Sequence, residues 1–136
     1  MISPASGQPQ LCGQIVLIAE RNPLIALDLA AMLGGWGARP MLFYDLDGPA
    51  QLAACSLAKA ALIDVPLDCD ALADLIAALS KHDVPTALTT AGGAAGLGGR
   101  FPGLEVFDKP VDYQALAQWI SSAVPSAART KQSGTG

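Results

Sequence analysis

The chain has 136 residues, of which 51% are hydrophobic and 15% are charged, and its formal net charge is -4. This length and composition are enough to build one core of ordinary size, so we expect a single domain. Acidic residues outnumber basic ones, which argues against direct binding of nucleic acid.

The three cysteines are Cys12, Cys55 and Cys69. Their number is odd and none of them forms a C-x-x-C pair, so neither a disulfide framework nor a zinc site is indicated. No stretch approaches the roughly 20 apolar residues of a membrane span, and the N-terminus lacks the pattern of a signal peptide. We therefore expect a soluble protein of the cytoplasm that does not contact a membrane.

Both ends of the chain differ in composition from the middle. Residues 1–13 are rich in Ser, Pro, Gly and Gln, which is typical of a flexible arm. Residues 125–136 form a polar segment that we expect to be a disordered tail. The domain is therefore predicted to span residues 14–124.

The domain opens with a short apolar run and a helix start. Residues 15–19 are apolar on both faces, which predicts a buried strand. Asn22 followed by Pro23 predicts the start of a helix, and Gly34-Gly35 its end. Asp28 is almost the only polar interruption in this helix. Two interpretations stay open: either neighbouring residues cover the helix, or it exposes an apolar patch that binds a partner.

Strands and helices alternate along the rest of the domain. Further strands are predicted at 39–44, 59–64, 84–90 and 104–107. Helices are predicted at 49–57, around Leu72, Leu75, Ile76 and Leu79, and after Asp112. Five of the nine residues in 91–99 are glycine, so the fourth helix should be short or irregular. The connections are too short for anything but an α/β fold with a doubly wound, five-stranded parallel sheet.

The most informative stretch is residues 60–66. An apolar run ends there at Asp64, and Pro66 forbids an ordinary continuation of the strand. Ligands of open α/β sheets bind at the carboxyl ends of the strands. That edge is predicted to gather Glu20, Arg21, Asp64, Thr90 and Lys109.

Asp64 ends the third strand, Thr90 ends the fourth, and Lys109-Pro110 follows the fifth. In these residues, and over residues 15–123, the chain resembles the receiver domain of response regulators. The resemblance implies a flavodoxin-like fold with strand order 2-1-3-4-5 and a cis Lys109-Pro110 peptide bond. It also implies that Asp64 accepts a phosphoryl group, which Thr90 and Lys109 bind through its oxygens.

The resemblance extends to partners and regulation. The Asn-Pro-Leu-Ile-Ala-Leu-Asp-Leu run that begins at Asn22 looks like the first helix of receivers found beside sensory kinases. The implied partner is a histidine kinase or phosphotransfer protein that contacts this helix, and a homodimer stays open. Receivers also carry an aromatic residue three positions before the Lys, but here Val106 stands there, with Phe107 beside it.

A carboxylate that attacks a phosphoryl group meets charge repulsion, so positive charge must be supplied at the site. In receivers a Mg²⁺ ion helps to do so, and the resemblance implies a weak metal site of Glu20, Asp64 and Pro66. Receivers have two acids after the first strand, but here Arg21 replaces the second, which is the direct metal ligand. We hypothesise that Arg21 occupies the place of the cation and pairs with Asp64. The alternative is that Arg21 points into solvent and the site binds metal weakly.

Three functions remain to be compared. The first is an atypical receiver in a two-component phosphorelay, which is a signalling domain and not an enzyme. The second is a receiver-like scaffold that binds proteins independently of phosphorylation. The third is an enzyme or nucleotide-binding protein on the same sheet. It would need a glycine-rich loop or a catalytic Ser, His or Cys at a strand end, and the residues from Glu20 to Pro23 offer none.

Overall fold

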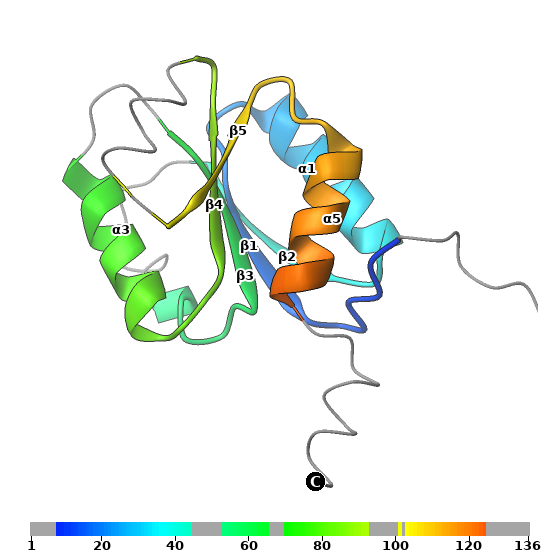
Figure 1. Ribbon diagram of the computed structural model, residues 1–136, viewed down its shortest axis with the longest axis horizontal. Helices are drawn as coiled ribbons and strands as arrows, with labels where there is room; N and C mark the ends of the chain where they lie inside the picture. The colour runs from blue at the N-terminus through cyan, green and yellow to red at the C-terminus, as the bar shows by residue number, and fades with distance from the viewer. Residues whose placement is uncertain (1–7, 45–52, 66–69, 93–100, 102, 125–136) are drawn as a thin grey trace, which may run out of the picture.

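The computed structural model describes residues 8–44, 53–65, 70–92, 101 and 103–124. Five parallel strands form one sheet in the order β2-β1-β3-β4-β5, as predicted (Figure 1). The strands are β1 (Ile15–Ala19), β2 (Arg39–Phe43), β3 (Ala60–Asp64), β4 (Thr86–Thr90) and β5 (Glu105–Asp108). The helices are α1 (Pro23–Gly35), α3 (Asp70–Lys81) and α5 (Tyr113–Ala123). No helix in the described ranges is long and apolar enough to cross a membrane.

Helices cover both faces of the sheet, with α1 and α5 on one face and α3 on the other (Figure 1). Alternate residues of the central strand belong to the two cores: Leu62 joins the cluster under α1 and α5, and Ile63 joins the cluster under α3. Every residue of β3 is buried. Because both faces are covered, this strand is a continuous apolar run and not an alternating one.

α1 begins and ends where the sequence predicts. The Asn22 side chain accepts a hydrogen bond from the Leu24 N–H at 3.0 Å, and Pro23 opens the helix. Gly34 and Gly35 are the last two residues of the helix, as predicted. The left-handed residue is Gly37, with φ +91°, where an added Cβ would lie 3.1 Å from the backbone nitrogen of Cys12. The turn that follows the helix therefore requires glycine at position 37.

The packed part of the chain begins earlier than residue 14. Leu11 is 1% exposed and belongs to the core under α1 and α5. Its N–H donates to the Trp36 carbonyl at 2.8 Å, and the Gly13 N–H donates to the Gly37 carbonyl at 2.6 Å. Residues 8–13 therefore differ from the flexible arm expected for 1–13, because Leu11 anchors them to the end of α1.

The last two helices follow their sequence patterns. Leu72, Leu75 and Leu79 of α3 are buried against the sheet. Asp112 caps α5 by accepting from the N–H groups of Gln114 and Ala115. Other predictions lie outside the described residues: the tail, Pro66, the first part of the helix over 49–57, and most of the glycine-rich segment.

Candidate functional site

The topology brings polar residues at the carboxyl ends of four strands to one edge of the sheet. These residues are Glu20 and Arg21 after β1, Asp64 at the end of β3, Thr90 at the end of β4, and Lys109 after β5. Together they line an open cavity of about 940 Å³. The structure thus brings together every predicted site residue that it describes.

Lys109 joins the two buried carboxylates of the site. Its Nζ lies 2.6 Å from Asp64 Oδ1 and 3.0 Å from Glu20 Oε1. The side chains of Asp64 and Glu20 are only 7% and 2% exposed. Burial acts to lower the pKa of Lys109, but the hydrogen bond to Asp64 and the negative charges of Asp64 and Glu20 outweigh it, so this pKa is raised. The ammonium therefore stays charged and offsets the cost of burying two acids.

Arg21 approaches the oxygen of Asp64 that Lys109 leaves open. Its Nε lies 3.5 Å from Asp64 Oδ2, and its side chain is 57% exposed, so the guanidinium stands at the mouth of the cavity. The remaining carboxylate oxygen of the site, Glu20 Oε2, accepts a hydrogen bond from the Asn22 N–H at 3.1 Å. Each of the four carboxylate oxygens therefore faces a cation or donor of the chain itself.

The described residues of this site do not favour a magnesium ion. Mg²⁺ requires oxygen ligands in near-octahedral geometry, but Lys109, Arg21 and Asn22 already engage the oxygens of Glu20 and Asp64. Across the described residues, no three His, Cys, Asp or Glu side chains gather as a metal site. A cation beside Asp64 would also lie next to the positive charges of Lys109 and Arg21, which oppose its binding.

Thr90 reaches the cavity but its hydroxyl is already engaged. The side chain is buried, and Oγ1 donates to the Gly92 carbonyl at 2.5 Å and accepts from the Gly92 N–H at 3.3 Å. To bind an incoming oxyanion, the hydroxyl would have to exchange the carbonyl for the new acceptor.

The segment that carries Lys109 has two further features. The Lys109-Pro110 peptide bond is cis, as the resemblance implies. Phe107 is buried, and its ring lies edge-on to Trp119 with 6.4 Å between centroids and 79° between planes. Val106 belongs to the opposite core, under α3. The aromatic ring beside the expected switch position is therefore fixed on the α5 side of the sheet.

The apolar surface of α1 is only partly covered. Leu24 is 79% exposed and Leu27 is 54% exposed, so the interpretation of an exposed patch holds for these two residues. A groove of about 490 Å³ between α1 and the start of α5 adjoins Leu24 and reaches Lys109. The Tyr113 hydroxyl donates to the Asp28 carboxylate and so joins the two helices.

Two polar contacts were missed by sequence reasoning. Asn22 was expected only as a helix cap, yet its backbone N–H also orients Glu20. The pairing of Tyr113 with Asp28 joins residues 85 positions apart. No local pattern announces such a contact, because it depends on how two helices pack.

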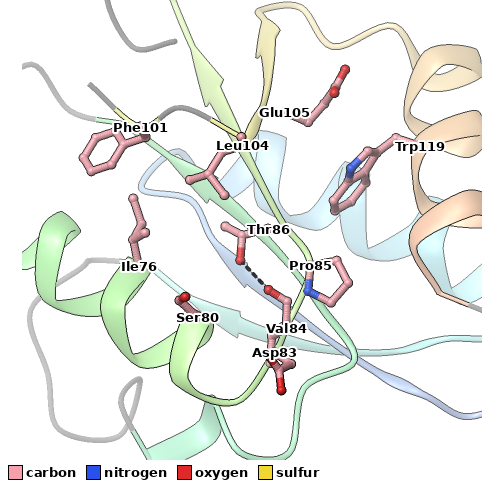
Figure 2. A pocket seen from close by; sticks show the side chains of 11 residues that line it. Ile76, Ser80, Asp83, Val84, Pro85, Thr86, Phe101, Leu104, Glu105 and Trp119 are labelled. Carbon is pink, nitrogen blue, oxygen red and sulfur yellow. Dashed lines mark hydrogen bonds between the residues drawn. The ribbon is translucent and has the colours of Figure 1, made fainter. Parts of the chain in front are cut away.

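A second cavity, of about 590 Å³, lies at the opposite end of the sheet (Figure 2). Thr86 and Glu105, the first residues of β4 and β5, line it together with the aromatic rings of Phe101 and Trp119. The Thr86 hydroxyl donates to the Val84 carbonyl at 3.0 Å. None of the predicted site residues takes part, so this cavity is separate from the carboxylate site.

Comparison with solved structures identifies the fold. The chain is similar to the receiver domain of a sensor histidine kinase from Pseudomonas aeruginosa PAO1, which holds a magnesium ion in its active-site cleft. The two are 24% identical with a TM-score of 0.64, over 84% of this chain and 99% of that one. The chemotaxis protein CheY4 of Vibrio cholerae is 15% identical with a TM-score of 0.66, over 82% and 99% of the two chains.

A response regulator receiver protein from Sinorhizobium medicae gives a TM-score of 0.69 at 14% identity, over 82% of this chain and 94% of that one. No family model and no curated protein matches the chain by sequence. The chain therefore has the fold of a receiver domain.

Proposed function

We propose that the chain is an atypical receiver domain that accepts a phosphoryl group on Asp64 in a two-component phosphorelay. The observation that carries this proposal is the position of Asp64. Its buried carboxylate ends the central strand, opens into the cavity and lies 2.6 Å from the ammonium of Lys109. A phosphoryl acceptor needs this combination of a positioned nucleophile and fixed positive charge.

The chemistry divides among the residues as follows. A carboxylate oxygen of Asp64 attacks the phosphorus atom, and the bond from phosphorus to the donor breaks as the new P–O bond forms. Lys109 and Arg21 stabilise the charge on the phosphoryl oxygens. Glu20 holds Lys109 in place, and Thr90 can supply a hydroxyl donor once it releases Gly92.

The proposed donor is the phosphohistidine of a histidine kinase or phosphotransfer protein. Leu24 and Leu27 form an exposed apolar surface on α1, and the groove beside Leu24 leads to Lys109. A helical partner seated on this surface would hold its histidine at the mouth of the cavity. The domain then acts as a signalling module in the cytoplasm and not as an enzyme with a substrate of its own.

A phosphorylation-independent scaffold is the second candidate function. The ion pairs of the site favour this function, because the charge of Asp64 is already balanced by Lys109 and Arg21. The Thr90 hydroxyl is likewise already bonded to the Gly92 carbonyl. In that case the α1 surface would bind its partner equally well with Asp64 and with Asn at this position.

Intact-protein mass spectrometry after incubation with acetyl phosphate tests the proposal. We expect an adduct of one phosphoryl group in the native protein and none in Asp64→Asn. The exposed residue Asp74 on α3 provides a matched control, because Asp74→Asn should still be labelled. No adduct in the native protein under any buffer condition would leave the scaffold as the better account.

A further inference from the structure

We infer that Arg21 takes the place of the divalent cation, so that Asp64 accepts its phosphoryl group without any metal ion. This inference rests on the proposed function, and it concerns what drives the transfer. Its evidence is the charge of the site, the engagement of its oxygens and the exposure of Arg21.

The charges of the site balance without a metal ion. Glu20 and Asp64 contribute two negative charges, and Lys109 and Arg21 contribute two positive charges. Arginine in place of an acid changes the local charge from −1 to +1. This difference of two charge units equals the charge of the Mg²⁺ ion in receivers. The side chain of Arg21 therefore supplies positive charge that a metal site obtains by binding an ion from solution.

The two cations flank opposite oxygens of the nucleophile. Lys109 contacts Asp64 Oδ1, whereas Arg21 approaches Oδ2 from the open side of the cavity. At 3.5 Å and 57% exposure, Arg21 is only loosely held, so it can shift toward an incoming group at small cost. Its planar guanidinium suits paired phosphoryl oxygens.

The transfer balances without a metal ion or a proton. With acetyl phosphate as donor, an electron pair on an Asp64 oxygen forms the new P–O bond. The P–O bond to the acetyl group breaks, and its electron pair leaves on acetate. During this exchange Lys109 on one side and Arg21 on the other neutralise the phosphoryl oxygens.

Labelling with acetyl phosphate is therefore compared in EDTA and in MgCl₂ at equal ionic strength. The native protein should gain the adduct at rates within about twofold of each other in the two buffers, because its cation is part of the chain. Arg21→Asp should be labelled in MgCl₂ but at least about tenfold more slowly in EDTA, as expected when one charge-stabilising group is lost. Arg39→Asp, at an exposed residue on β2, is the matched control and should behave as the native protein does.

Direct binding gives a readout that does not depend on phosphorylation. Isothermal titration calorimetry with MgCl₂ should give no binding heat for the native protein and a measurable isotherm for Arg21→Asp. The melting temperature should likewise rise with MgCl₂ only in Arg21→Asp, relative to NaCl at the same ionic strength.

The outcomes separate the two proposals. The proposed role of Arg21 would be overturned if the native protein were labelled only in MgCl₂, or if the native protein and Arg21→Asp bound Mg²⁺ with equal affinity. Either result would still support Asp64 as the phosphoryl acceptor. No labelling in either buffer would overturn the proposed function itself. Labelling of the native protein in EDTA that is absent in Asp64→Asn supports both.

Discussion

Lys109 links the two buried acids of the site, and this makes it a stability determinant as well as a site residue. Its Nζ is within 3.0 Å of an oxygen from each acid. The residue types at the strand ends were enough to predict that Glu20, Asp64 and Lys109 meet. Which oxygen each cation engages could not be predicted, because that depends on side-chain rotamers and on the loop after β1.

Replacing Lys109 should destabilise the domain. Lys109→Ala leaves two buried carboxylates side by side, for which we expect a loss of about 3 kcal/mol in the free energy of unfolding at pH 7. Urea unfolding at pH 7 measures this loss, with Lys81→Ala as a control at an exposed helix end. An equal loss in both variants would contradict the prediction.

Tyr113 gives a second pH-dependent contribution. Burial, together with its hydrogen bond and proximity to Asp28, raises the pKa of Tyr113 to about 12, above the ordinary value near 10. The protonated hydroxyl therefore stabilises the fold fully below about pH 10, and this stabilisation is lost as the pH rises toward 12.

We expect Tyr113→Phe to cost about 1 kcal/mol of unfolding free energy at pH 8. At pH 11 the cost should be smaller, since the unfolded native chain then gains from ionising its tyrosine. Urea titrations of the two proteins at each pH provide the comparison, and Asp28→Asn should make the cost of Tyr113→Phe smaller. The prediction would be wrong if the loss of unfolding free energy in Tyr113→Phe were larger at pH 11 than at pH 8.

Among the elements, α1 serves both the core and the surface. Leu29 and Leu33 are buried against the sheet, whereas Leu24 and Leu27 face outward. The sequence predicted the helix and its cap but left its two interpretations open. An almost uniformly apolar helix has no polar face to indicate its exposed side, so its packing on the sheet and beside α5 decides which residues are covered.

The outward leucines should matter for partners and little for folding. Leu24→Ser with Leu27→Ser should change the unfolding free energy by less than about 0.5 kcal/mol per residue, whereas Leu29→Ala should cost about 3 kcal/mol. With a purified, phosphorylated histidine-phosphotransfer domain, the double variant should receive the phosphoryl group more slowly. Its labelling by acetyl phosphate should be unchanged, and a parallel loss in both assays would argue against docking on α1.

The end of α1 offers a matched pair of glycines. Gly37→Ala places a methyl group in the left-handed region and 3.1 Å from a backbone nitrogen, which should cost about 2 kcal/mol. Gly34→Ala meets no atom within 4 Å inside the helix and should stabilise it by up to about 1 kcal/mol. Thermal or urea unfolding should show a lower free energy of unfolding for Gly37→Ala and a higher one for Gly34→Ala. A change in the same direction for both variants would contradict the prediction.

For the molecule as a whole, strand positions and sheet order follow well from the sequence. The strands could be predicted from apolar runs such as residues 60–63, because a strand buried on both faces is apolar at every position. The positions of Asp64 and Lys109 then indicated the sheet order through the resemblance to receivers. The edge of the domain was harder to predict. Leu11 belongs to no apolar run that would predict a buried element, yet it packs in the core under α1 and α5, and its N–H donates to the Trp36 carbonyl.

A chain that starts at residue 14 should therefore be less stable than one that starts at residue 8. Loss of the buried Leu11 side chain should cost about 2 kcal/mol, in addition to the two backbone hydrogen bonds. Urea unfolding of both truncated chains and of Leu11→Ala checks this estimate. Equal stability of the two truncated chains would mean that the segment from 8 to 13 contributes nothing to the fold.

The ring contact between Trp119 and Phe107 has a spectroscopic consequence. Phe107 stands two residues before Lys109 on the same segment, and the indole of Trp119 lies edge-on to it. A displacement of β5 that follows events at Lys109 changes the surroundings of this indole, and hence its fluorescence. With the second tryptophan changed in Trp36→Phe, Trp119 becomes the single tryptophan of the chain, and its selectively excited emission can report on the site without an attached dye.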